Sequence, residues 1–170
     1  MNRYLLSSYK FGLAGGVLGA LAFWILKISG LEPVSYTLIF GYMVIPVFIF
    51  LGIKNFRDNN NDQELFFAQG MTVGFFIYSI FGVFLATMIS LYLFIQPEIF
   101  NEYIQMNLDF LVQRKDQISG EMGQITYESL YQSSLNNTVS DIFLDYLAKI
   151  TIFGLLSTII ISVILKQSKV

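Results

Sequence analysis

The chain has 170 residues, of which 55% are hydrophobic and 13% are charged, and its formal net charge is -2. It contains no cysteine and no histidine, which excludes disulfides, thiolate nucleophiles, haem or iron–sulfur ligation and the common zinc sites. Binding a phosphate backbone needs clustered Lys and Arg, and a chain with a negative net charge does not indicate such a cluster, so we expect no nucleic-acid partner. We therefore expect a membrane protein without a cofactor and without enzymatic activity.

Four long apolar stretches divide the chain. They are Phe11–Leu26, Val34–Ile53, Met71–Ile95 and Leu147–Leu165. A bilayer core about 30 Å thick requires about 20 apolar residues of helix, so stretches of this length are read as membrane spans. We predict an all-α integral membrane four-helix bundle, formed as a single domain by residues 1–170. Pro46 lies inside the second stretch, and the backbone hydrogen bond that proline removes predicts a kink near residues 43–46.

The basic residues near the ends of the spans predict the orientation. If both termini face the cytoplasm, the inner side carries Arg3, Lys10, Lys54, Arg57, Lys166 and Lys169. The outer side then carries Lys27, Arg114, Lys115 and Lys149. Arg114 and Lys115 count for less because they lie deep in a long loop. We predict that both termini are cytoplasmic and that residues 96–146 lie outside the cytoplasm.

The outer segment shows helical spacing from Pro97 onward. Its apolar stripe includes Phe100, Tyr103, Ile104, Leu108 and Leu111, and the opposite face includes Glu98, Glu102, Gln105, Asp109 and Gln113. Gly120 and Gly123 are expected to break this pattern before a second, weaker helix over residues 125–135, which ends at Asn136. Ser140 is expected to cap the final helix. We predict an extramembrane amphipathic helical segment over residues 97–140.

The apolar stripe of this segment has two interpretations. It packs on the membrane surface or on the protein's own bundle, or it is a docking surface for a partner. The candidate partner surface consists of Phe100, Tyr103, Ile104, Leu108 and Leu111.

Small residues recur every four positions in three of the four spans. The candidate packing residues are Gly12, Gly16, Gly70, Gly74, Gly82 and Gly154. Lipid gives little hydrophobic drive for helix association, so small residues mark the contacts where backbones approach closely. The rows predict packing within the chain, and the alternative is a dimer seam through the glycines near the N-terminus.

Asp145 and Lys149 are four residues apart at the outer edge of the fourth span. This spacing predicts an ion pair on one face of a helix. Charged groups inside a membrane are costly and often functional, but this pair is shallow. We interpret it as an interfacial anchor, with a functional carboxylate as the alternative.

One run in the chain is typical of a known family. The run is Gly52-Ile53-Lys54-Asn55-Phe56-Arg57-Asp58, and it is followed by Leu65-Phe66-Phe67-Ala68-Gln69-Gly70. With the terminal stretch Leu156–Lys166, it resembles domain-of-unknown-function family 4199, four-pass membrane proteins found largely in Bacteroidetes. The resemblance covers nearly the whole chain. It implies a multi-pass protein of a bacterial inner (cytoplasmic) membrane and supplies no activity.

Two functions are favoured by these features over a third, an enzyme that acts on lipid through Asp141, Asp145 or Glu98. The first is an uncharacterised accessory or scaffolding component of the membrane, which acts through helix packing and the outer segment. Its partners are the lipid bilayer and either another membrane protein or further copies of the chain. The alternative is a small transport or permeation component, for which a water-filled cavity would be lined by Tyr36, Thr37, Tyr42, Tyr78, Thr87 and Ser90.

Overall fold

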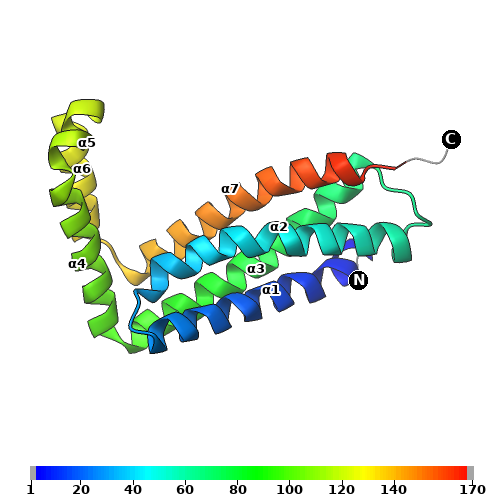
Figure 1. Cartoon of the computed structure of the whole chain (residues 1–170), viewed down its shortest axis with the longest axis horizontal. Coiled ribbons are helices and arrows are strands. Elements are labelled where there is room, and N and C mark those ends of the chain that lie inside the picture. Colours follow the sequence, from blue (N-terminus) through cyan, green and yellow to red (C-terminus); the bar gives the residue numbers. More distant parts are fainter. Residues whose placement is uncertain (1–2, 168–170) are drawn as a thin grey trace. The chain divides into compact units, whose positions relative to one another are not determined.

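The computed structural model describes residues 3–167 and consists of helices joined by short connections (Figure 1). The helices are α1 (Arg3–Ile28), α2 (Pro33–Asn60), α3 (Phe67–Ile95), α4 (Pro97–Gln113), α5 (Lys115–Met122), α6 (Gln124–Leu135) and α7 (Val139–Leu165). Four of them, α1, α2, α3 and α7, are long and apolar enough to cross a membrane. The prediction of an all-α, multi-pass membrane protein is confirmed. Lys169, which entered the orientation argument, lies outside the described residues.

Each long helix extends beyond its apolar stretch, and the ends are set by capping groups. The carboxylate of Glu32 accepts hydrogen bonds from the backbone N–H groups of Val34 and Ser35, at 2.6 and 2.7 Å. It therefore satisfies donors that the first turn of α2 leaves unpaired, next to a proline in that turn. Inside α2, the helix continues through Pro46, and the predicted kink there stays a prediction.

The start of α7 corrects one expectation. Thr138, not Ser140, caps this helix: the backbone N–H of Asp141 donates to Oγ1 of Thr138, at 3.3 Å. The Asp141 carboxylate in turn accepts from the backbone N–H and the hydroxyl of Thr138, at 2.8 and 2.6 Å. This reciprocal arrangement resembles a capping box, in which two groups satisfy each other's backbone donors. Sequence reasoning missed it because Ser140 and Thr138 are equally suitable cap residues by type.

Contacts among Cα atoms divide the chain into two compact units. The first contains residues 1–88 and 144–170, and the second contains residues 89–143. In the first unit, α1, α2 and the greater parts of α3 and α7 lie side by side as a bundle (Figure 1). Its interior is filled by large apolar side chains, among them Phe23, Phe56, Phe81 and Ile49, all 0–1% exposed.

Along the contact between α3 and α7, a glycine of one helix faces a larger residue of the other at each position. Moving along α3, the contacts pair Gly70 with Ser162, Gly74 with Thr158, Tyr78 with Gly154 and Gly82 with Ile150. A Cβ atom added at Gly154 would lie 2.5 Å from Cβ of Tyr78, and one at Gly70 would lie 2.7 Å from Oγ of Ser162. Both helices advance by four residues per contact in opposite directions, as expected for an antiparallel pair. Tyr78, which interrupts the small row of α3, is accommodated by the glycine of α7.

The glycines of α1 lie against α3. A Cβ at Gly12 would lie 2.8 Å from the carbonyl oxygen of Ile77, and one at Gly16 would lie 2.7 Å from the ring of Phe84. The hydroxyl of Ser8 also donates to the carbonyl oxygen of Val73, at 3.1 Å. A dimer seam through these glycines would compete with contacts that the chain already makes within itself.

The second unit contains α4, α5 and α6. α6 packs against both α4 and α5, so the outer segment forms a helical hairpin with a short additional helix at its turn. The expected break at Gly120 is wrong, because Gly120 lies inside α5 with nothing near its Cα that a side chain would meet. Gly123 does end α5, with a φ of 89° that favours glycine.

We predict that Gly154→Ala destabilises the bundle. The added methyl group would collide with Tyr78, and such overpacking typically costs about 1–3 kcal/mol. The expected result is a lower midpoint of thermal unfolding for the purified protein in a mild detergent. Gly120→Ala is the matched control and should leave the midpoint unchanged or raise it, because alanine favours a helix over glycine by about 1 kcal/mol. Equal midpoints for the two variants would contradict the proposed register.

Candidate functional site

The apolar stripe of α4 is largely covered by the chain itself. Phe100, Tyr103, Ile104 and Leu111 are half-buried, and Leu108 is 7% exposed. This is the burial expected of a stripe that packs within the protein, and α4 contacts α6. Its role as a docking surface for a partner stays a prediction.

The exposed face of α4 is different in character. Met106 is 39% exposed and Phe110 is 51% exposed, although both are apolar. They lie in a shallow groove of about 650 Å³ whose other lining residues are Asn101, Glu102, Gln105, Asp109 and Gln113. Four of the polar members, Glu102, Gln105, Asp109 and Gln113, were predicted on the outward face, whereas Asn101, Met106 and Phe110 were not. The four-residue spacing of Met106 and Phe110 places them on one face of the helix, but it does not show that this face is uncovered.

The two basic residues of the outer segment contact aromatic rings. The guanidinium carbon of Arg114 lies 4.4 Å from the centre of the Phe110 ring, and Nζ of Lys115 lies 5.6 Å from the centre of the Tyr127 ring. Tyr127 is 7% exposed and its ring stacks on that of Tyr131, with 6.1 Å between the centres. Cation–π contacts of this kind are worth about 0.5–1 kcal/mol at exposed sites. They stabilise the turn between α4 and α6.

Asp145 and Lys149 form an ion pair on α7. Nζ of Lys149 lies 2.6 Å from Oδ2 of Asp145, and both side chains are about half exposed. An exposed pair at this helical spacing contributes about 0.3–0.5 kcal/mol. Among residues 3–167, no three Asp, Glu, His or Cys side chains gather as they would to hold a metal ion.

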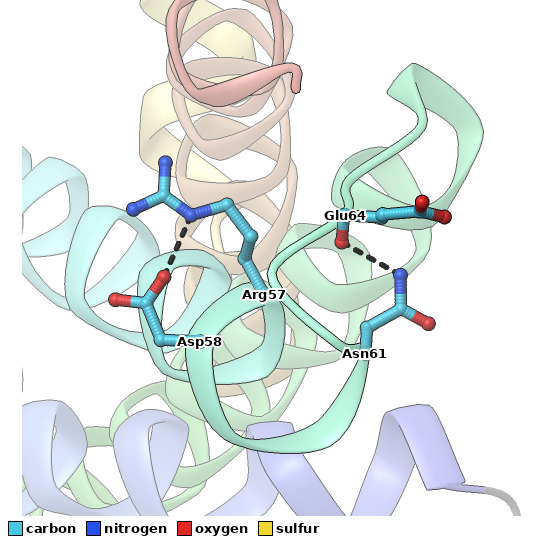
Figure 2. Close-up of polar contacts among 4 residues, drawn as sticks. All are labelled: Arg57, Asp58, Asn61 and Glu64. Atoms are coloured by element: carbon cyan, nitrogen blue, oxygen red, sulfur yellow. Dashed lines mark hydrogen bonds and ion pairs between the residues drawn. The ribbon is translucent and has the colours of Figure 1, made fainter. Parts of the chain in front are cut away.

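Side-chain hydrogen bonds hold the turn between α2 and α3, and Figure 2 draws the one between Asn61 and the carbonyl of Glu64. Nδ2 of Asn61 donates to the carbonyl oxygen of Glu64, at 2.7 Å, and to Oε1 of Gln69, at 2.9 Å. The same Oε1 accepts from the backbone N–H of Phe66, at 3.0 Å. Asp62 and Gln63 have φ angles of 50° and 65°, a backbone region that residues other than glycine rarely adopt. The amides of Asn61 and Gln69 therefore hold a turn that the backbone alone disfavours.

The charged groups of this turn are not gathered into a site. Arg57 Nε lies 2.7 Å from Oδ1 of Asp58, whereas the carboxylate of Glu64 points away from Asn61 (Figure 2). Leu65 also forms a β-bridge with Gln167: its N–H donates to the Gln167 carbonyl, at 2.8 Å, and its carbonyl accepts from the Gln167 N–H, at 3.1 Å. This turn is a structural clamp that ties α2, α3 and the end of α7 together.

We predict that Gln69→Leu weakens this clamp and Gln69→Glu does not. Oε1 of Gln69 acts only as an acceptor in the two hydrogen bonds described, and a carboxylate oxygen accepts equally well. Leucine leaves the Phe66 N–H and the Asn61 amide without their partner, which costs about 1–3 kcal/mol where such groups are buried and less where water reaches them. The thermal midpoint in detergent should fall for Gln69→Leu alone. A similar fall for both variants would show that the amide acts in another way.

Comparison with known proteins gives one result. The family model of proteins of unknown function DUF4199 matches residues 10–167, nearly the whole described chain. No curated protein and no solved structure matches this chain. The match agrees with the four membrane-length helices and with the resemblance carried by the run from Gly52 to Asp58. The chain therefore belongs to the DUF4199 family, whose function is unknown.

Proposed function

We propose that the protein is an accessory or scaffolding component of a bacterial inner membrane, with both termini in the cytoplasm. In this proposal it presents the exposed face of α4 to a second membrane protein. The observation that carries the proposal is the groove on α4, where Met106 and Phe110 remain exposed and the carboxylates of Glu102 and Asp109 are among the other lining residues. Exposed aromatic and methionine side chains rimmed by polar groups are typical of protein interfaces.

The composition of the outer segment supports a protein partner. Of its residues 96–146, eight are acidic and two are basic, and the two basic ones contact aromatic rings. An acidic segment is repelled by the anionic lipids of a membrane surface. A protein surface with basic residues complements it better, because opposite charges favour encounter and fix the orientation of partners.

A transport function receives less support from the described side chains. A permeation path needs polar groups that face a common space, but two of the tyrosines predicted to line it pack against other residues. The ring of Tyr42 packs on Phe153, with 4.7 Å between centres, and Tyr78 packs on Gly154. Tyr36 is 49% exposed and lines an apolar groove between α1 and α2.

The test compares two charge-introducing double variants of the full chain. Met106→Glu with Phe110→Glu changes the α4 groove, whereas Met122→Glu with Ile125→Glu changes exposed apolar residues of α5 and α6. The tagged proteins are extracted gently from the native membrane, and the mass and composition of each complex are measured. We expect a stoichiometric second polypeptide with the wild type and with the α5–α6 variant, and its loss with the α4 variant.

Two results contradict the proposal. One is a wild-type complex that contains no second polypeptide, which would favour self-assembly or permeation. The other is a partner that stays bound to the α4 variant, which would place the docking surface elsewhere. Circular dichroism of each variant checks that its helices are intact.

A further inference from the structure

An apolar groove runs between α1 and α2 on the outside of the first unit. Its volume is about 490 Å³, and the side chains that line it include Leu18, Ala22, Ile25, Ile39, Phe40 and Met43. The flanking side chains are strongly exposed: Ile25 is 63% exposed, Ile39 is 54% exposed and Met43 is 72% exposed. The groove is therefore open along the surface of two membrane-length helices.

The groove extends over the depth of one leaflet. It begins close to the turn between Ile28 and Pro33, where the charged residues Lys27 and Glu32 mark the membrane surface. Nζ of Lys27 lies 5.4 Å from the centre of the Trp24 ring, a pairing typical of the headgroup level. From Leu26 the groove reaches Leu18, a length of about 12 Å at 1.5 Å per residue. Half of a bilayer core is about 15 Å.

The occupant of this groove comes from the bilayer. The exposed apolar side chains on either side of it belong to the lipid-facing surface of the spans, so the groove is continuous with the protein–lipid interface. A second helix would need small residues for close approach, whereas Ala22 is the single small residue among those that line the groove. A flexible chain of methylene groups can follow the uneven floor between large side chains, which a rigid helix cannot.

We infer that the groove binds one acyl chain of a phospholipid from the leaflet that meets the α1–α2 turn. The bound chain buries apolar surface of Leu18, Ile25 and Ile39 and fills the gap between the two helices. Because this chain contacts two walls of protein rather than one, it exchanges more slowly than the lipids that surround the rest of the bundle. The inference is independent of the partner proposed for the outer segment.

The experiment uses a tryptophan reporter. The chain contains one tryptophan, Trp24, so Trp24→Phe provides a background without fluorescence from this residue type. In this background, Phe40→Trp places a reporter in the groove, and Phe75→Trp places one on an exposed position of α3. The full chain is reconstituted in phosphatidylcholine brominated on its acyl chains, then extracted with an unbrominated detergent and purified. Bromine quenches a tryptophan with which it is in contact.

We expect Phe40→Trp to remain quenched after extraction and Phe75→Trp to recover its emission. Ala22→Phe fills the groove and should restore the emission of the Phe40→Trp protein. Ala14→Phe is the matched control, because Ala14 is exposed on the same helix outside the groove, and it should leave the quenching in place. Leu18→Phe, which fills the inner end of the groove, replaces Ala22→Phe if that variant loses its helical circular dichroism.

Three results overturn the inference. They are equal recovery of both reporters, quenching that persists when the groove is filled, and a dimer mass with an unquenched Phe40→Trp reporter. The last result would mean that a helix of a second copy, rather than a lipid, occupies the groove.

Discussion

The close approach of α3 and α7 is the contact on which the bundle depends. Inside a bilayer, the burial of apolar surface against protein gains little over its burial against lipid, so helices associate through fitted packing. In this chain a glycine of α3 receives a larger side chain of α7 at three of the four contacts, and at the fourth a glycine of α7 receives a side chain of α3. Tyr78 and Gly154 show the reversal most clearly, since the tyrosine stands in an otherwise small row of α3.

At the ends of the spans, hydrogen bonding of the backbone matters more than close packing. There, water is available and each helix must satisfy its terminal backbone groups. Glu32, Thr138 and the amide of Gln69 do so with side-chain oxygens. The turn that contains Gln69 is held by side-chain hydrogen bonds, whereas the groove on α4 combines carboxylates with the exposed side chains of Met106 and Phe110.

The sequence predicts the four spans well because length and apolar composition are sufficient to define a membrane helix. It also predicts α4 and α6, whose apolar spacing is regular, and the pairing of Asp145 with Lys149, which needs one helix alone. It does not predict that Gly120 continues a helix, because the cost of a glycine is small enough for neighbouring contacts to offset. Nor does it predict the partners of each small residue, since these depend on the relative positions of helices that are distant in the sequence.

The same limit applies to the surfaces with functional interest. Met106 and Phe110 appear as ordinary members of a helix until the structure shows that they remain uncovered. The apolar groove between α1 and α2 is invisible in the sequence, because each of its side chains alone is typical of a membrane span. Each surface exists because neighbouring helices leave its side chains exposed, and this depends on how the chain folds.

The pairing of α7 with α3 also constrains how the protein is made. Because α7 follows α1, α2 and α3 in the sequence, synthesis includes an interval in which Gly70, Gly74 and Gly82 of α3 have not yet met α7. During this interval the backbone of Leu65 lacks the partner that Gln167 later provides. The contact between α3 and α7 and the β-bridge between Leu65 and Gln167 can therefore form only after the first three spans have been made.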